Sequence, residues 1–178
     1  MSQTTPSLDL ADFIRDVPDF PKPGITFKDI TPLLANHEAL SVCIDRFVDE
    51  YQGKGIDVIA AAEARGFLFA VPLALRLGVG MVPIRKPGKL PFDTHSYSYE
   101  LEYGSDTLEM HIDGIDEGQN VLVIDDLLAT GGTVQACCEM IEACKANIAG
   151  CAFLINLKFL NGSKKLDQYP IFSLIDYA

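Results

Sequence analysis

The chain has 178 residues, of which 48% are hydrophobic, and this is enough for one domain with a complete core. Its formal net charge of -11 argues against a nucleic-acid surface, because such a surface needs a basic face to neutralise phosphates. No apolar run reaches the roughly 20 residues of a membrane-spanning helix, and Met1 to Leu10 lacks the pattern of a secretory signal. We therefore expect one cytoplasmic domain over residues 1–178, with neither a nucleic-acid nor a membrane partner.

The five cysteines give no sign of a disulfide framework or a zinc site, because their number is odd and no C-x-x-C pair occurs. Three of them, Cys137, Cys138 and Cys144, share one stripe of an expected helix. We expect these thiols to be small core residues, as free cysteines usually are.

The N-terminal part predicts short elements rather than a long one. An apolar stripe capped by Ser7 indicates an amphipathic helix from Ser7 to Val17, ended by Pro18. Prolines make Phe20 to Gly24 extended or turn-forming, and Ile25 to Ile30 reads as a short strand. This segment either covers a pocket or packs on the core as an N-terminal arm.

Helices and strands then alternate along the chain, which predicts an α/β fold with a mainly parallel central sheet flanked by helices. The expected elements are a helix capped by Asn36 to about Tyr51, a strand over Asp57–Ala62, a helix over Phe67–Leu77, and strands over Met81–Ile84, Val121–Ile124, Ala152–Leu157 and Ile171–Ile175. Arg65 follows the first of these strands, and ligands of open α/β sheets bind at that end of a strand.

A basic run, Arg85 to Lys89, opens a long segment before the next core strand in this acidic chain. Tyr97 to Glu100 and Thr107 to His111 alternate like the two strands of a hairpin. An arm of this size, residues 85–111, is more often a lid than an insertion without a function. The alternative is that the charge run is only a solvated face.

The most informative stretch runs from Val121 to Thr133. An apolar, β-branched run to Ile124 predicts a strand buried on both faces, and Asp125 and Asp126 place two carboxylates at its C-terminal end. A turn of small and hydroxyl residues, Ala129 to Thr133, leads into a helical pattern from Val134.

A strand, a small-residue turn and a helix form an anion site, because the first backbone N–H groups of a helix have no partner within it. Gly131 and Gly132 let the backbone approach a phosphate, and Thr130 and Thr133 add hydroxyl donors. The carboxylates would repel that phosphate, so they suit a neighbouring ribose diol or Mg²⁺. The stretch therefore predicts a ribose 5-phosphate site; the alternative is a buried strand with solvated aspartates at its edge.

The stretch from Asp125 to Thr133 resembles the phosphoribosyl diphosphate (PRPP) signature of type I phosphoribosyltransferases, in particular the adenine phosphoribosyltransferase family. The likeness runs from Phe20 to Leu174, and its other specific pieces are Phe20–Ile30, Glu63–Phe67, Arg85–Pro91 and Leu101–Gly104. It implies the type I phosphoribosyltransferase fold, with an N-terminal hood over residues 1–35, a flexible β-hairpin lid, and a homodimer.

The resemblance also implies an activity, purine salvage by transfer of the 5-phosphoribosyl group of PRPP to adenine, giving AMP and pyrophosphate. Mg²⁺ would be bound mainly through PRPP or pyrophosphate, with no direct protein ligand assigned. The implied site residues are Ala129, Thr130, Gly131, Gly132 and Thr133 for the 5-phosphate, Asp125 and Asp126 for the ribose and metal environment, Ala64, Arg65, Arg85, Lys86 and Lys89 for pyrophosphate, Thr26, Phe27, Lys28 and Leu127 for adenine, Glu102 as the acid–base residue, and Tyr103 on the lid.

Two other functions stay open at this point. Some proteins of this fold use the PRPP site as a sensor that controls nucleic-acid binding, although the net charge of -11 speaks against that class here. The second alternative is a transferase that acts on another purine.

Overall fold

The computed structural model of the chain describes residues 8–100 and 105–178. The backbone divides into two compact units, Met1–Arg46 and Phe47–Ala178, so the boundary falls inside a helix, α2 (His37–Tyr51). That helix is confirmed at the predicted place, and the Asn36 side chain accepts a hydrogen bond from the Ala39 N–H at 2.9 Å, as an N-cap residue does. Whether the chain behaves as one domain stays a prediction.

The N-terminal unit contains a small antiparallel ribbon. A 3₁₀ turn, η1 (Leu10–Phe13), precedes β1 (Arg15–Val17), which pairs with β2 (Phe27–Asp29); α1 (Thr31–Ala35) follows. The predicted strand near Ile25–Ile30 is therefore confirmed, but the predicted helix from Ser7 to Val17 is wrong. A helix this short is marginal without tertiary support, and pairing with β2 draws its second half into a strand. Ser7 lies outside the described residues.

The second unit is built on a five-stranded, fully parallel sheet in the order β4-β3-β7-β8-β9. Its strands are β3 (Val58–Ala62), β4 (Gly80–Ile84), β7 (Asn120–Leu128), β8 (Asn147–Leu157) and β9 (Ile171–Tyr177). Each predicted core strand is present, and the predicted α/β class is confirmed. Since all strands run the same way, their carboxyl ends share one edge.

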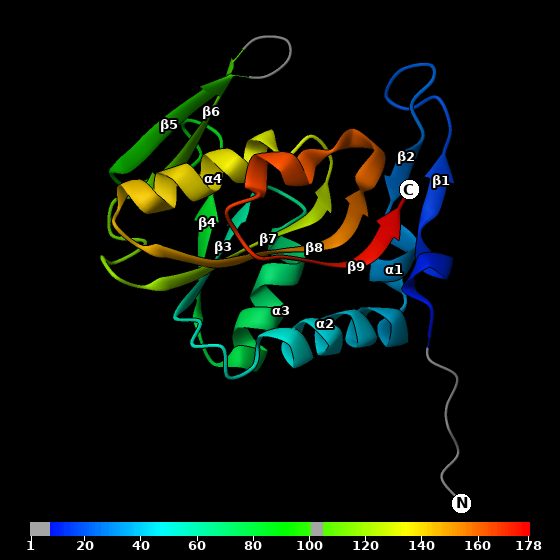
Figure 1. Cartoon of the computed structure of the whole chain (residues 1–178), viewed down its shortest axis with the longest axis horizontal. Helices are drawn as coiled ribbons and strands as arrows, with labels where there is room; N and C mark the ends of the chain where they lie inside the picture. Colours follow the sequence, from blue (N-terminus) through cyan, green and yellow to red (C-terminus); the bar gives the residue numbers. More distant parts are fainter. Residues whose placement is uncertain (1–7, 101–104) are drawn as a thin grey trace, which may run out of the picture. The chain divides into compact units, whose positions relative to one another are not determined.

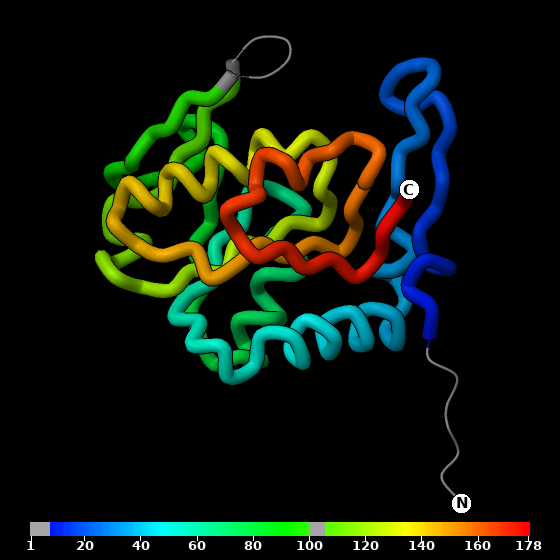
Figure 2. The backbone as a smooth tube through the Cα atoms, in the orientation of Figure 1, coloured from blue at the N-terminus to red at the C-terminus, as the bar shows by residue number. Residues whose placement is uncertain are grey.

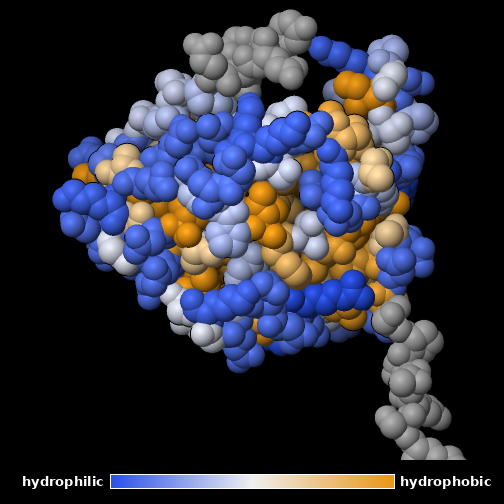
Figure 3. Space-filling model, in the orientation of Figure 1, coloured by the Kyte–Doolittle hydropathy of each residue, from blue (hydrophilic) through white to orange (hydrophobic). Residues whose placement is uncertain are grey.

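Helices α3 (Phe67–Leu77) and α4 (Gly132–Ala143) lie on opposite faces of this sheet (Figure 1). All five residues of β3 are buried, because alternate side chains face each helix layer. On the α4 side, Val121 and Val123 pack with Cys137 and Cys138, so these two thiols are core residues as predicted. The third, Cys144, is only partly buried and packs against this core. The outward surface over α4 is hydrophilic, which completes its amphipathic pattern (Figure 3).

Two further segments border the sheet. The predicted hairpin is confirmed as β5 (Thr94–Glu100) and β6 (Ser105–His111), which pair antiparallel. After β8 the chain forms two 3₁₀ turns, η2 (Lys158–Leu160) and η3 (Gly162–Leu166), and the tube in Figure 2 shows this segment beside the start of α4. In the described part of the chain no helix is long and apolar enough to cross a membrane. The cytoplasmic location stays a prediction.

Candidate active site

Two adjacent carboxylates lie near the carboxyl edge of the sheet, on β7. The sequence placed Asp125 and Asp126 after the strand, but β7 continues to Leu128, so both lie within it and point to opposite faces. Asp126 is buried, and its backbone N–H donates to Asp125 Oδ1 at 2.8 Å. Gly66 makes room for this arrangement, because a Cβ there would lie 3.1 Å from Asp125 Oδ1.

Burial dominates the electrostatics of this pair. It raises the pKa of Asp125 well above the ordinary carboxyl range, and the negative charge of Asp126 raises it further. Burial also raises the pKa of Asp126, while the guanidinium of Arg65 opposes that rise. The opposing charge is close, since Arg65 Nε lies 3.0 Å from Asp126 Oδ2. The structure thus brings together Arg65 and the two aspartates that the sequence singled out.

The glycine turn lies directly after these carboxylates. Gly131 has φ 80°, a left-handed conformation that glycine adopts without steric cost, and α4 begins at Gly132 rather than at the expected Val134. A pocket that is open to solvent is lined by Asp125, Leu127, Leu128, Ala129, Thr130, Gly131, Gly132, Thr133 and Val134. The predicted 5-phosphate residues and Leu127 therefore border one pocket, which the N-terminal end of α4 makes favourable for an anion.

A second glycine, Gly162, holds this turn from behind, and sequence reasoning did not identify it. The backbone of Gly162 packs so tightly on the turn that an added Cβ would lie 3.0 Å from Gly131 N and well inside van der Waals distance of Ala129 O. Conversely, a Cβ on Gly131 would meet Gly162 O at 2.5 Å. The only signal in the sequence is a glycine after Asn161, and the partner of that glycine is far away along the chain.

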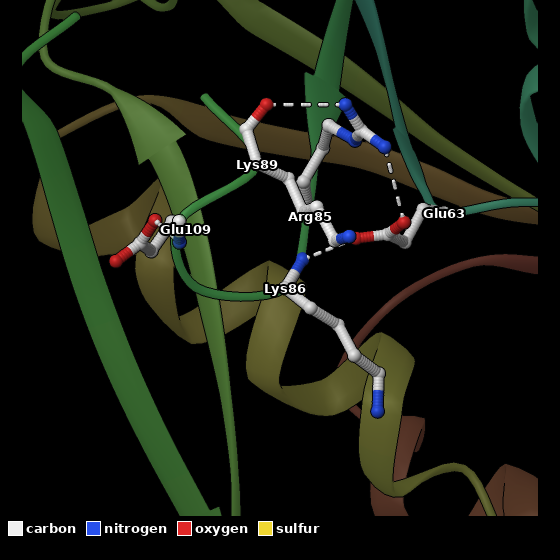
Figure 4. A network of polar contacts seen from close by, with 6 residues as sticks. Glu63, Arg85, Lys86, Lys89 and Glu109 are labelled. Carbon is white, nitrogen blue, oxygen red and sulfur yellow. Dashed lines mark hydrogen bonds and ion pairs between the residues drawn. The ribbon is translucent and has the colours of Figure 1, made fainter. Parts of the chain in front are cut away.

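The basic run forms a loop held by acidic side chains (Figure 4). Glu63 accepts a hydrogen bond from the Lys86 N–H and one from the Arg85 guanidinium at 3.3 Å. Both bonds lower the pKa of Glu63, and the bond from Lys86 has the larger effect. Glu109 accepts from Gly88 N–H at 3.0 Å, so it is structural, not merely solvated as a hairpin carboxylate would be. The loop containing Arg85, Lys86 and Lys89 is therefore joined to the strand end that leads to Ala64 and Arg65.

The predicted adenine residues Thr26, Phe27 and Lys28 belong to the N-terminal unit. Phe27 packs edge-to-face on Phe20 with ring centroids 5.2 Å apart, and Lys28 Nζ lies 2.6 Å from Asp16 Oδ1. Both contacts stabilise the ribbon of β1 and β2. The remaining predicted residues, Glu102 and Tyr103, lie outside the described residues.

Comparison with known proteins identifies the class. The Phosphoribosyl transferase domain family matches residues 29–176. Adenine phosphoribosyltransferase of Rhodopirellula baltica is 58% identical over 171 residues, which are 96% of this chain and 83% of that protein. The crystal structure of adenine phosphoribosyltransferase from Thermoanaerobacter pseudethanolicus superimposes with a TM-score of 0.92 at 54% identity, covering 94% of this chain and 98% of the other.

A more distant structure adds ligands. Adenine phosphoribosyltransferase from Trypanosoma brucei, in complex with AMP, pyrophosphate and ribose-5-phosphate, has a TM-score of 0.86 at 28% identity and covers 99% of this chain and 82% of that chain. The chain belongs to the type I phosphoribosyltransferase family and, within it, to the adenine phosphoribosyltransferases.

The contact between Gly162 and the turn gives a testable prediction. Gly162→Ala should displace Ala129 to Gly131 and weaken binding of ribose 5-phosphate by about tenfold, the effect of overpacking by about 1–3 kcal/mol. Titration calorimetry measures this, with pyrophosphate affinity expected to stay near wild type. The matched control is Gly80→Ala, where an added Cβ meets only Val58 Cγ2 at 3.9 Å. Unchanged ribose 5-phosphate affinity in a folded Gly162→Ala protein would contradict the assigned contact.

Proposed function

We propose that this protein forms AMP and pyrophosphate from adenine and PRPP at the carboxyl edge of its parallel sheet. The observation that carries the proposal is the glycine turn at the start of α4, which follows the carboxylates of Asp125 and Asp126 on β7. Of these two, Asp126 is buried and pairs with Arg65. The turn can donate backbone hydrogen bonds to a phosphate, and the carboxylates can accept hydrogen bonds from hydroxyl groups. The guanidinium of Arg65 can bind a second anion. The AMP, pyrophosphate and ribose-5-phosphate bound by the Trypanosoma brucei relative are consistent with these three subsites.

The 5-phosphate subsite consists of Ala129, Thr130, Gly131, Gly132 and Thr133. Backbone N–H groups at the start of α4 donate to the phosphate oxygens, and the helix dipole adds partial positive charge there. The hydroxyls of Thr130 and Thr133 supply further donors. Binding at this end fixes the ribose so that its diol faces the β7 carboxylates.

Asp125 and Asp126 accept hydrogen bonds from the ribose hydroxyls and provide the acidic environment for Mg²⁺. In the described part of the chain no three His, Cys, Asp or Glu side chains gather into a metal site. Two carboxylates fit Mg²⁺ nonetheless, because this ion commonly takes one or two carboxylates together with substrate phosphates and water. When bound, Mg²⁺ supplies positive charge against the pyrophosphate leaving group.

The pyrophosphate subsite is formed by Ala64 and Arg65 on one side and by Arg85, Lys86 and Lys89 on the other. Cleavage of the anomeric bond leaves an oxocarbenium-like ribose and a highly charged leaving group. Fixed cations stabilise that charge as it develops, which is the main electrostatic contribution available to such a site. The Glu63 contacts keep the two loops together.

The residues that we assign to adenine are Thr26, Phe27 and Lys28 in the N-terminal unit and Leu127 in the second unit. Phe27 would stack on the ring, and the backbone of Thr26 and Lys28 would read its edge. A backbone reader distinguishes adenine from hypoxanthine because the 6-amino donor and ring acceptor of adenine are both reversed in the 6-oxopurine. The Lys28–Asp16 ion pair leaves this backbone role intact.

One prediction of the proposed function concerns the base. With PRPP and Mg²⁺, the protein should convert adenine to AMP and should use hypoxanthine, guanine and xanthine on the order of 10⁴-fold less well, since a mismatched edge leaves buried polar groups unpaired. Chromatographic measurement of nucleotide formation with each base tests this. Comparable turnover of adenine and hypoxanthine would refute the base assignment.

Another prediction concerns Glu102, which we propose exchanges a proton with the purine. Adenine must lose a ring proton as the nucleotide forms, and general acid–base catalysis is typically worth about 10² to 10⁴-fold. Glu102→Leu should slow the chemical step in single-turnover experiments by that order while PRPP affinity stays near wild type. The control Glu100→Gln should have little effect. A wild-type single-turnover rate for Glu102→Leu would assign the proton transfer to another group.

A further prediction concerns assembly, because α3 carries an exposed apolar stripe. Leu68, Val71 and Leu75 follow helical spacing and remain 46%, 48% and 77% exposed. We propose that a second copy covers this stripe in a homodimer. The wild type should sediment at twice the chain mass, and Val71→Glu with Leu75→Glu should shift it to the monomer. The exposed change Lys164→Glu on η3 serves as control; a double variant that stays dimeric would place the interface elsewhere.

A further inference from the structure

The ammonium group of Lys86 is bound by a carboxylate of its own chain. Lys86 Nζ lies 2.9 Å from Asp106 Oδ2, and the Asp106 side chain is only 26% exposed. The hydrogen bond between them raises the pKa of Lys86 and lowers the pKa of Asp106. Both groups are therefore charged at neutral pH, and the pair is a true ion pair.

The position of Asp106 is fixed by its surroundings on the hairpin. Its second oxygen, Oδ1, accepts a hydrogen bond from the Thr107 N–H at 2.9 Å. Directly opposite on β5 is Tyr99, and the hydroxyls of Tyr99 and Thr133 lie 3.4 Å apart. The carboxylate is thus held between the basic loop and the first turn of α4.

The same pattern recurs at two other cations of the pyrophosphate subsite. Arg65 pairs with Asp126 at 3.0 Å, and Arg85 pairs with Glu63 at 3.3 Å. These two acids have other roles as well, because Asp126 belongs to the ribose subsite and Glu63 also accepts a hydrogen bond from the Lys86 N–H. Asp106 differs from them: loss of its charge leaves the backbone bonds of the basic loop to Glu63 and Glu109 in place.

We propose that Asp106 is a built-in counter-anion that occupies Lys86 in the unliganded protein and competes with pyrophosphate for it. This inference rests on the proposed function, since it takes Lys86 as a pyrophosphate ligand. Asp106 keeps the lysine charged and in place while the subsite is empty. It also lowers the affinity for pyrophosphate, which favours release of this product. Asp106 is accordingly a positioning residue that acts through Lys86.

The test is a gain of affinity. Asp106→Asn keeps a side-chain oxygen that can accept from the Thr107 N–H but removes the charge. Calorimetric titration with pyrophosphate and Mg²⁺ should therefore give a dissociation constant about two- to fivefold lower than wild type. The affinity for ribose 5-phosphate should not change. A variant that merely loosened the hairpin would bind pyrophosphate more weakly or unchanged. The control Asp113→Asn makes the same charge change at an exposed position after β6 and should have no effect.

A double-mutant cycle shows whether the gain acts through Lys86. In a Lys86→Met background, which itself should weaken pyrophosphate binding, Asp106→Asn should no longer tighten it. The proposal is overturned if Asp106→Asn does not tighten pyrophosphate binding, if Asp113→Asn tightens it equally, or if the gain persists without Lys86. Failure of the wild type to form AMP would sink the proposed function; normal AMP formation without the gain would sink only this inference.

Discussion

The structure depends on one backbone constraint, the abrupt passage from β7 into α4 at Gly131. The chain must adopt φ 80° there, and the space that a side chain would need is filled by the carbonyl of Gly162. Two stretches of backbone therefore fix each other. Because the turn is this tight, the start of α4 and the side chain of Asp125 border the same pocket. Under the proposed function, this pocket would bind the 5-phosphate close to the ribose hydroxyls.

Electrostatics at this edge follow from the same closeness. A chain with net charge -11 binds anionic substrates only if its few cations are concentrated and its acids are compensated. Here Arg65, Arg85 and Lys86 each have an acidic partner in the described structure. Burial of Asp125 and Asp126 raises the pKa of both carboxyl groups, so incoming hydroxyl groups and positive charge stabilise them as anions. Under the proposed function, substrate binding would exchange these internal ion pairs for ligand contacts.

Much of the fold was predictable from the sequence. Buried parallel strands have continuous apolar sequences, and the helical pattern of α3 lies between Gly66 and Gly78. The errors have physical causes. The helix expected from Ser7 does not form because Arg15 to Val17 pair as a strand instead. The strand β7 extends beyond Ile124 because the apolar residues Leu127 and Leu128 follow the two aspartates. The site motif could be predicted because it lies in one continuous stretch of sequence. The role of Gly162 and the pairing of Lys86 with Asp106 could not be predicted, because both depend on contacts between distant segments and on the register of the hairpin.

The central claim is that the turn at Gly131 binds the 5-phosphate while the cations at the same edge bind pyrophosphate. The most direct measurement is a crystal structure of the chain with ribose 5-phosphate, pyrophosphate and Mg²⁺. The account predicts phosphate oxygens within hydrogen-bond distance of the backbone N–H groups of Gly131 to Thr133, ribose hydroxyls on Asp125 and Asp126, and pyrophosphate against Arg65. A 5-phosphate bound away from the start of α4, or a ribose turned away from both carboxylates, would contradict it.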